Sequence, residues 1–145
     1  MPLAALGEAI RIWASGHIEK TLALATGGPY AHTRNPLYVG SLLLGLGLAL
    51  SAWSPWVAGA VGLYFAVFYP AVIREEAAFL RRKFGADYDA WAAAVPLFLP
   101  RLSPGGPRGS LFDWRRVRRN REWRTALALP AVLLLLAARA ALWPA

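Results

Sequence analysis

The stretch from Asn35 to Ile73 reads NPLYVGSLLLGLGLALSAWSPWVAGAVGLYFAVFYPAVI and has no charged side chain over thirty-nine residues. As one helix it would be about 58 Å long, nearly twice the roughly 30 Å hydrocarbon core of a bilayer. It must therefore fold back on itself. The break is predicted at Ser54, which can cap a helix that begins with Pro55. The result is a hairpin of two helices, about 36–52 and 55–73, each near the short limit for a membrane span.

Small residues recur along both arms of this hairpin. Ser41, Gly45 and Ala49 follow one another at a spacing of four on the first arm, and Ala58 and Gly62 do so on the second. Such stripes let two helix backbones approach closely. We expect them to pack the two arms together.

The composition agrees with a lipid environment. The 145 residues are 57% hydrophobic and only 17% charged, and sixteen Lys and Arg against eight Asp and Glu give a net charge of +8. Both fractions differ from those of a soluble domain, which has about 25% charged residues. Such a high hydrophobic and low charged content excludes a disordered protein or an acidic tail protein. The length allows one core. Without cysteine and with only two histidines, no disulfide, iron–sulfur cluster or metal site is expected.

Two further helices are predicted outside the hairpin. The apolar run 125–143 is expected to form a third span, in which Pro130 is tolerated and Arg139 lies near enough to the end to reach the interface. In the first fifteen residues, apolar side chains recur at helical spacing: Leu3, Leu6, Ile10 and Trp13. Glu8 and Arg11 fall on the other side, which predicts an amphipathic helix lying at the membrane interface or packed on the protein's own surface.

The polar segment from Arg74 to Arg124 holds twelve of the sixteen basic residues. By the positive-inside rule, this face of the protein is cytoplasmic. The segment predicts one short helix over 74–83, a stop at Gly85, a second short helix over 87–94 and an extended stretch over 95–101.

A Pro/Gly linker over residues 103–110 divides the chain into a core, 1–102, and a basic juxtamembrane helix with the last span, 111–145. The arginine run before this span could indicate nucleic acid. Its position beside a membrane helix makes anionic lipid headgroups the simpler partner, and no nucleic acid is expected.

Two polar clusters flank the hairpin. The first is the mouth segment 26–40, TGGPYAHTRNPLYVG, and the second is the pair Glu75-Glu76. Because a hairpin returns its two ends to the same membrane face, these clusters are expected to be neighbours in space.

Five motifs stand in order along the chain: Gly28-Pro29-Tyr30, Arg34-Asn35-Pro36-Leu37-Tyr38-Val39-Gly40, Glu75-Glu76, Phe84-Gly85-Ala86-Asp87-Tyr88 and Val95-Pro96-Leu97-Phe98-Leu99-Pro100-Arg101. Together they resemble the isoprenylcysteine carboxyl methyltransferase family, which forms one group of integral membrane enzymes with the phospholipid N-methyltransferases. The resemblance covers about residues 7–101. It implies an all-α integral membrane helical bundle, here with about three spans, the N-terminal amphipathic helix and short cytoplasmic helices. The active site would face the cytoplasm.

The resemblance also implies S-adenosylmethionine as cofactor, placed between the mouth segment, the preceding 22–25 backbone and the Glu pair. The implied cofactor-binding residues are Leu22, Leu24, Ala25, Tyr30, Asn35, Pro36, Leu37, Tyr38, Glu75 and Glu76, and the implied catalytic residues are Arg34, Asn35 and Tyr38. The family's mouth motif usually reads Arg-His-Pro-x-Tyr, so Asn35 replaces a titratable histidine here.

The chemistry of these side chains suits that assignment. Tyr30 and Tyr38 can face a cation with their rings or form hydrogen bonds with their hydroxyls. Arg34 can pair with the cofactor's carboxylate or with an anionic acceptor. Glu76, and Glu75 beside it, can accept hydrogen bonds from ribose hydroxyls or the ammonium group.

Each assignment has a structural alternative. The Glu pair could form helix ion pairs with Arg81, Arg82 or Lys83. The tyrosines could belong to an interfacial belt, and Asn35 could cap a helix. His17 and His32 are expected to be interfacial or hydrogen-bonded rather than catalytic.

The function expected from the residues and the resemblance is methylation of a lipophilic acceptor, the carboxylate of an isoprenylated cysteine or a similar acid. The alternatives are the amine of a phospholipid headgroup and a catalytically silent membrane scaffold. Family members usually have further spans before the stretch that matches 7–11. We therefore expect a minimal site, a shortened start, or a bundle completed by a homo-oligomer or a partner subunit.

Overall fold

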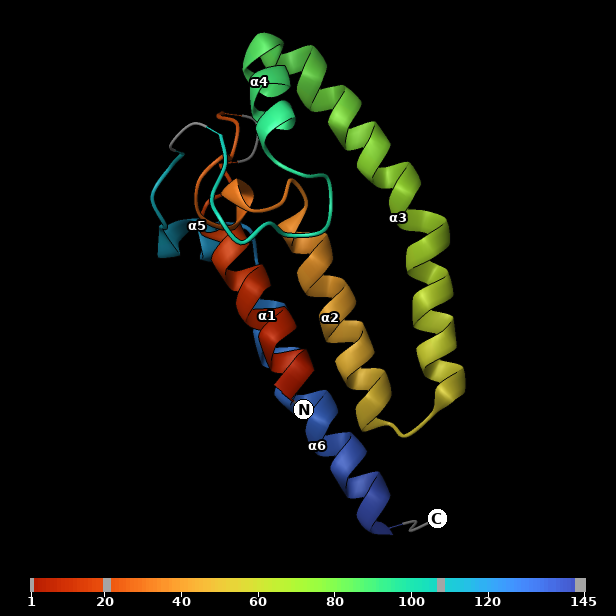
Figure 1. Ribbon diagram of the computed structural model, residues 1–145. Helices are drawn as coiled ribbons and strands as arrows, with labels where there is room; N and C mark the ends of the chain where they lie inside the picture. Colours follow the sequence, from red (N-terminus) through yellow and green to blue (C-terminus); the bar gives the residue numbers. More distant parts are fainter. Residues whose placement is uncertain (1, 20–21, 107–108, 143–145) are drawn as a thin grey trace.

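The computed structural model describes residues 2–19, 22–106 and 109–142, without the side chains of 139–141. Within these ranges the chain is all-helical, which confirms the predicted class (Figure 1). The elements are α1 Pro2–Ser15, the 3₁₀ turn η1 Gly28–Ala31, α2 Pro36–Ser51, α3 Pro55–Phe84, α4 Ala86–Ala94, α5 Trp114–Arg119 and α6 Trp123–Leu142. The long helices extend from a head formed by the loops, η1, α4 and α5.

The hairpin breaks where the sequence predicts. Helix α2 ends at Ser51, and α3 starts at Pro55 after Ser54, whose hydroxyl accepts a hydrogen bond from the Val57 amide at 3.4 Å. Trp53 adopts a φ of 50° in the turn and is 93% exposed. Cap and proline together start the new helix, and the turn reverses the chain.

Helix α3 is longer than predicted. It does not end at Ile73, and the separate helix predicted over 74–83 is wrong because those residues are the last turns of α3. Charged side chains do not end a helix when their propensity is good. The stop is Gly85, whose φ of 53° is a conformation that favours glycine, and α4 follows directly.

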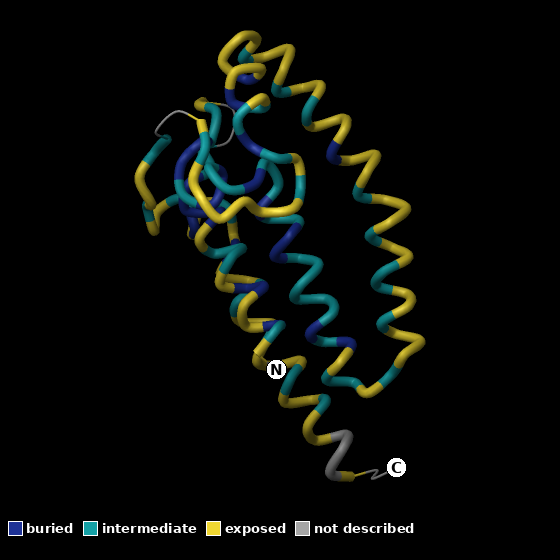
Figure 2. Tube along the Cα trace, in the orientation of Figure 1, coloured by how far each residue is buried: buried dark blue, intermediate teal, exposed yellow. Residues whose placement is uncertain are grey.

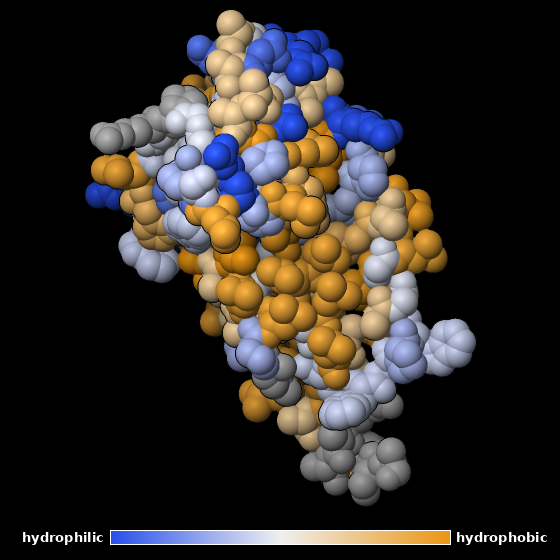
Figure 3. Space-filling model, in the orientation of Figure 1, coloured by the Kyte–Doolittle hydropathy of each residue, from blue (hydrophilic) through white to orange (hydrophobic). Residues whose placement is uncertain are grey.

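The helix surfaces are unusually apolar. Figure 3 shows hydrophobic side chains over the helical part and hydrophilic ones gathered at the head. Figure 2 shows exposed residues along nearly all of α3. In the described chain α3 is the one helix long and apolar enough to cross a membrane, whereas α2 and the 123–138 part of α6 are shorter apolar helices. Three spans remain a prediction, and the Arg139 side chain lies outside the described residues.

The predicted N-terminal helix forms, and it packs on the bundle through small residues and Glu8. Its buried side carries Ala4, Gly7 and Glu8, whereas the apolar Leu6 and Trp13 are exposed. The helix packs along α2. In lipid, small residues at the contact let backbones approach, and large apolar side chains can face outward.

The closest helix contact is therefore between α1 and α2, and not within the hairpin. A Cβ at Gly7 would lie 2.5 Å from the Gly40 oxygen and the Leu44 nitrogen, and one at Gly47 would overlap Ala4. Residues 4 and 7 thus meet 47 and 40–44, so the two helices run antiparallel. Of the small residues predicted to pack the hairpin, Gly45 does face α3, but Gly62 has nothing within 4 Å.

Candidate active site

The two polar clusters that flank the hairpin meet, as predicted. The Tyr38 hydroxyl, in the first turn of α2, donates a hydrogen bond to Glu76 Oε2 of α3 at 2.9 Å. The ring of Tyr69 packs edge-on against Tyr38, with centroids 4.9 Å apart. The hairpin thus orients one carboxylate of the Glu pair toward the mouth segment.

A buried aromatic core supports this arrangement from the head. The Trp91 indole N–H of α4 donates to the Tyr30 carbonyl at 3.0 Å, and Tyr88 packs edge-on against Trp91. Tyr30, Tyr88, Trp91 and Val95 are all buried in one cluster. Helix α4 is therefore the support on which the mouth segment rests.

The extended stretch after α4 runs beside the mouth segment. The Arg34 amide donates to the Pro96 carbonyl at 2.9 Å, and the Arg101 amide donates to the His32 carbonyl at 3.0 Å. The hydroxyl of Thr33, which is buried, donates to the Phe98 carbonyl at 2.8 Å. These bonds fix the backbone of the segment that carries Arg34 and Asn35.

A pocket of about 420 Å³ lies between the mouth segment, the end of α3 and α4. Its volume is within the range of about 300–1,000 Å³ typical of cofactor sites. The described lining consists of Ile18, Glu19, Ala23, Leu24, Ala25, Tyr30, Arg34, Asn35, Leu37, Ile73, Glu76, Ala77, Phe79, Leu80, Lys83, Phe84, Tyr88, Trp91 and Leu97.

Two polar side chains of this pocket, Arg34 and Tyr30, differ in their hydrogen bonding and protonation. Arg34 Nε is buried and has no hydrogen-bond partner within the described structure. A buried unpaired donor is costly, so an anionic group bound beside it would relieve that cost. Burial, helped by the nearby Glu76, raises the pKa of Tyr30 well above its ordinary value of 10.0, so this phenol is neutral at physiological pH.

Seven of the eleven residues that the sequence singled out line this pocket: Leu24, Ala25, Tyr30, Arg34, Asn35, Leu37 and Glu76. The other four do not line it. Leu22 is 72% exposed, Pro36 is fully buried at the start of α2, and Glu75 is exposed. Tyr38 reaches the site through Glu76.

Asn35 takes the N-cap position of α2, but its side chain does not cap the helix. Its Nδ2 instead donates to the Leu97 carbonyl at 2.8 Å. The amide thus ties the mouth segment to the stretch after α4, a role that needs no titration.

The structure bears differently on the structural alternatives for the two histidines and for the Glu pair. His17 Nδ1 lies 2.9 Å from the Trp13 carbonyl and His32 Nδ1 lies 2.8 Å from the Arg101 carbonyl, so both rings are hydrogen-bonded to backbone. The ion pair of Arg81 is made with Asp89 at 2.7 Å. Glu76 accepts a hydrogen bond from Tyr38 across the hairpin.

Sequence reasoning missed the wall supplied by α3 and α4. On α3, Ile73, Ala77, Leu80 and Phe84 line the pocket beside the predicted Glu76. They are spaced three and four apart, which places them on one face of a helix. Continuing α3 through its charged residues would have revealed that face.

Comparison with known proteins supports the resemblance to membrane methyltransferases. The family model described as phospholipid methyltransferase matches residues 4–87, more than half of the chain. No solved structure matches the chain.

Two curated relatives are similar over 95 residues. They are the nickel-cobalt-cadmium resistance protein NccN of Alcaligenes xylosoxydans xylosoxydans, 41% identical, and the cobalt-zinc-cadmium resistance protein CzcN of Cupriavidus metallidurans, 43% identical. Each match covers 64% of this chain but only 44% of the relative, so the chain spans less than half of their length. The match of the family model decides the assignment: the chain belongs to the phospholipid methyltransferase family.

Proposed function

We propose that this chain is a membrane methyltransferase that uses S-adenosylmethionine to methylate a lipophilic acceptor at the head of its apolar bundle. One observation carries the proposal. The hairpin directs Glu76, held by Tyr38, toward the same pocket in which Arg34 Nε is buried without a partner among the described residues. A carboxylate and a guanidinium in one pocket are complementary to a ligand that bears both an ammonium and a carboxylate group.

The pocket residues fit this cofactor. Glu76 can accept from ribose hydroxyls or from the ammonium group, and Arg34 can bind the carboxylate. Neutral Tyr30 and the Trp91 indole offer aromatic faces to a cation or a base. When bound, S-adenosylmethionine supplies an electrophilic methyl group on a sulfonium whose positive charge is lost on transfer.

The chain's own contribution is orientation and exclusion of water. Positioning can supply roughly 7–11 kcal/mol of such a barrier. The Asn35 amide cannot accept a proton, and the buried Tyr30 phenol keeps its proton because its pKa is raised. A carboxylate acceptor needs no proton removed before it attacks, which supports the carboxylate of an isoprenylated cysteine or a similar lipophilic acid.

The second candidate acceptor is the amine of a phospholipid headgroup. The description of the matched family favours it. An ammonium group must first lose a proton, and Glu19 and Glu76 are the carboxylates of the described pocket lining that could accept it.

A transfer assay tests both candidates. The purified full chain is incubated with methyl-labelled S-adenosylmethionine and either small prenylated thiols with a free carboxylate or phosphatidylethanolamine vesicles. We expect label in the prenylated acid, released as volatile methanol by base because the product is an ester. Base-stable label in the phospholipid would support the amine acceptor instead. No transfer to either class by a folded sample that binds the cofactor would contradict both, leaving the silent scaffold.

The names of the two relatives connect those proteins with metal resistance. Among the described residues, no group of three or more His, Cys, Asp or Glu side chains could hold a metal ion. We propose that any contribution of this chain to metal tolerance passes through its methylated product. Cells that carry Glu76→Gln should then lose tolerance together with methyl transfer. Full tolerance without methyl transfer would contradict that link.

A further inference from the structure

Helix α5, Trp114–Arg119, is fixed to the helix bundle along one side, and we call this helix the platform. Asp113 caps it by accepting from the Arg115 amide at 2.8 Å, and Val117 is buried beneath it. Asn120 Nδ2 donates to the carbonyls of Ser15 at 2.9 Å and Ile18 at 3.2 Å, where α1 ends. The platform is therefore held by backbone contacts as well as packing.

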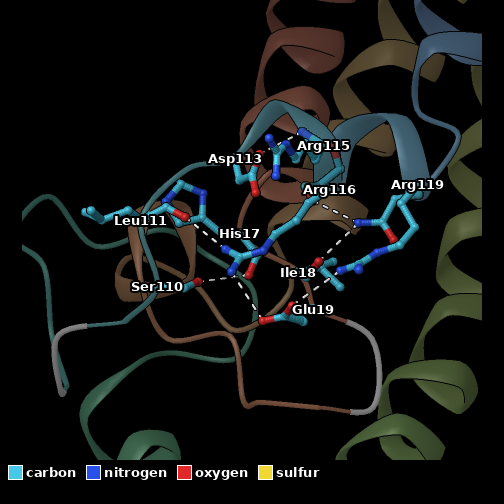
Figure 4. A network of polar contacts seen from close by, with 11 residues as sticks. His17, Ile18, Glu19, Ser110, Leu111, Asp113, Arg115, Arg116 and Arg119 are labelled. Atoms are coloured by element: carbon cyan, nitrogen blue, oxygen red, sulfur yellow. Dashed lines mark hydrogen bonds and ion pairs between the residues drawn. The ribbon is translucent and has the colours of Figure 1, made fainter.

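The same side of the platform reaches the pocket wall. Arg116 donates to Glu19 Oε2 at 3.2 Å and to the Leu111 carbonyl at 2.9 Å. Arg119 pairs with the other Glu19 oxygen at 3.6 Å (Figure 4). Because Glu19 lines the pocket, the platform has a fixed position beside the candidate active site.

Helix α5, the turn after it and the start of α6 carry exposed arginines. Arg115, Arg118 and Arg121 are exposed, and within the described structure their side chains make no hydrogen bond or ion pair. Arg124 lies over the Trp123 ring, 5.6 Å from its centroid. We call Arg115, Arg118, Arg121 and Arg124 the arginine face.

Exposed apolar side chains accompany the arginine face: Leu111, Trp114 and Trp123. Helix α6 starts at Trp123 and continues with exposed leucines such as Leu127 and Leu134. Tryptophans beside arginines at the start of an apolar helix are typical of the membrane–water interface. The arginine face thus lies at the level where lipid headgroups would be.

We propose that the arginine face is a docking surface for anionic phospholipid headgroups. Charge complementarity carries the proposal, because four exposed guanidiniums recur at every third residue from 115 to 124 while the nearby carboxylates are engaged. Asp113 caps α5, Glu19 holds Arg116 and Arg119, and Glu122 holds Arg11. Juxtamembrane arginines attract an anionic leaflet, and the inserted tryptophans add apolar contact.

The test is lipid binding by the full chain in nonionic detergent, followed by native mass spectrometry with equal amounts of phosphatidylglycerol and phosphatidylcholine. Each arginine near an anionic surface contributes about fivefold in affinity, so the double variant Arg115→Gln/Arg118→Gln should lose about 25-fold of the preference for phosphatidylglycerol. The matched control is Arg74→Gln/Arg82→Gln, which removes the same charge from the exposed surface of α3.

Four outcomes decide the proposal. A loss confined to the α5 variant, and weakened by added salt, supports it. An unchanged preference in that variant, or an equal loss in the control, overturns it. Binding of a single-stranded oligonucleotide at physiological salt that the α5 variant abolishes, without any lipid preference in the wild type, would assign the face to nucleic acid and also overturn it. The assay involves no methyl transfer, so its result is independent of the proposed activity.

Discussion

The Tyr38 hydroxyl links the two arms of the hairpin through one bond to Glu76, and this bond gives the carboxylate a fixed direction at the pocket. Tyr38→Phe removes the bond and keeps the ring that packs on Tyr69. A hydrogen bond to a charged group contributes about 1.5–3 kcal/mol, so we expect S-adenosylmethionine to bind about ten- to hundredfold more weakly in calorimetry. The control is Tyr64→Phe, on α3 outside the described pocket lining. Equal affinity of Tyr38→Phe and the wild type would show that the bond does not orient Glu76 for binding.

Arg34 has two candidate partners, and its variants can separate them. Its backbone bond to Pro96 is kept in Arg34→Gln, so the mouth segment should hold its shape. If Arg34 binds the cofactor's carboxylate, this variant should bind S-adenosylhomocysteine at least about tenfold more weakly, with methylthioadenosine, which lacks that carboxylate, unaffected. If it binds an anionic acceptor, the acceptor KM rises while both nucleosides bind normally. Unchanged values in all three measurements would remove Arg34 from the site.

At the scale of helices, the glycine contact between α1 and α2 gives a clear stability prediction. Gly7→Ala places a Cβ 2.5 Å from two backbone atoms of α2, which must separate the helices. Overpacking of this kind costs typically 1–3 kcal/mol. We expect a lower Tm by circular dichroism in detergent.

The matched control for Gly7→Ala lies on α3. A Cβ at Gly59 would have nothing within 4 Å, so Gly59→Ala should keep or raise the Tm through its better helix propensity. If both variants lowered the Tm equally, close backbone approach would not be the cause.

How far the helices could be predicted depended on which physical signal marks each boundary. Ser54 and Pro55 start a helix through local bonding and φ, so the hairpin and the proximity of the mouth segment to the Glu pair followed from the sequence, whereas the Tyr38–Glu76 bond is seen only in the structure. The end of α3 was misjudged because a change from apolar to charged residues marks a membrane boundary and not a helix end. Apolar periodicity did not decide which side of α1 packs on the bundle, because it locates a core in water, whereas in lipid it can mark the outside.

The pocket was predictable only in part for the same reason. The mouth segment and Glu76 carry chemistry in their residue types, so sequence could identify them. Phe79, Leu80 and Tyr88 contribute shape, and their place depended on the unbroken α3 and on the turn at Gly85. Glu19 joins the wall through a loop whose position is set by α5, more than ninety residues away in sequence.

For the whole molecule, a largely buried ion pair holds Glu122, the residue before α6, to the bundle. Arg11 of α1 donates to Glu122 at 2.6 Å and also bonds to the Ser41 hydroxyl of α2. Breaking a buried pair costs about 3–5 kcal/mol, since the remaining charge stays unpaired. Arg11→Met should therefore lower the Tm strongly.

The exposed pair of Arg81 and Asp89 supplies the control, because Arg81→Met should change the Tm little. The double variant Arg11→Met/Glu122→Leu should recover part of the loss, since no unpaired partner of Arg11 is left at Glu122. A Tm of Arg11→Met equal to that of Arg81→Met would show that this pair does not hold the bundle together.

Orientation in the membrane is a second prediction at this scale. The basic head predicts a cytoplasmic face, and the chain has no native cysteine. A cysteine introduced as Ser103→Cys should react with a membrane-impermeant maleimide only after the cells are opened. Labelling of intact cells would reverse the orientation.

The most direct test of the proposed site is calorimetric titration of S-adenosylmethionine into the full chain in detergent. We predict saturable binding by the wild type and a loss of about tenfold or more in Glu76→Gln, whose carboxylate charge is removed. Asp87→Asn, an exposed acidic change in α4 outside the described pocket lining, should bind like the wild type. No binding by the folded wild type, or equal binding by Glu76→Gln, would contradict the assignment of this pocket to the cofactor.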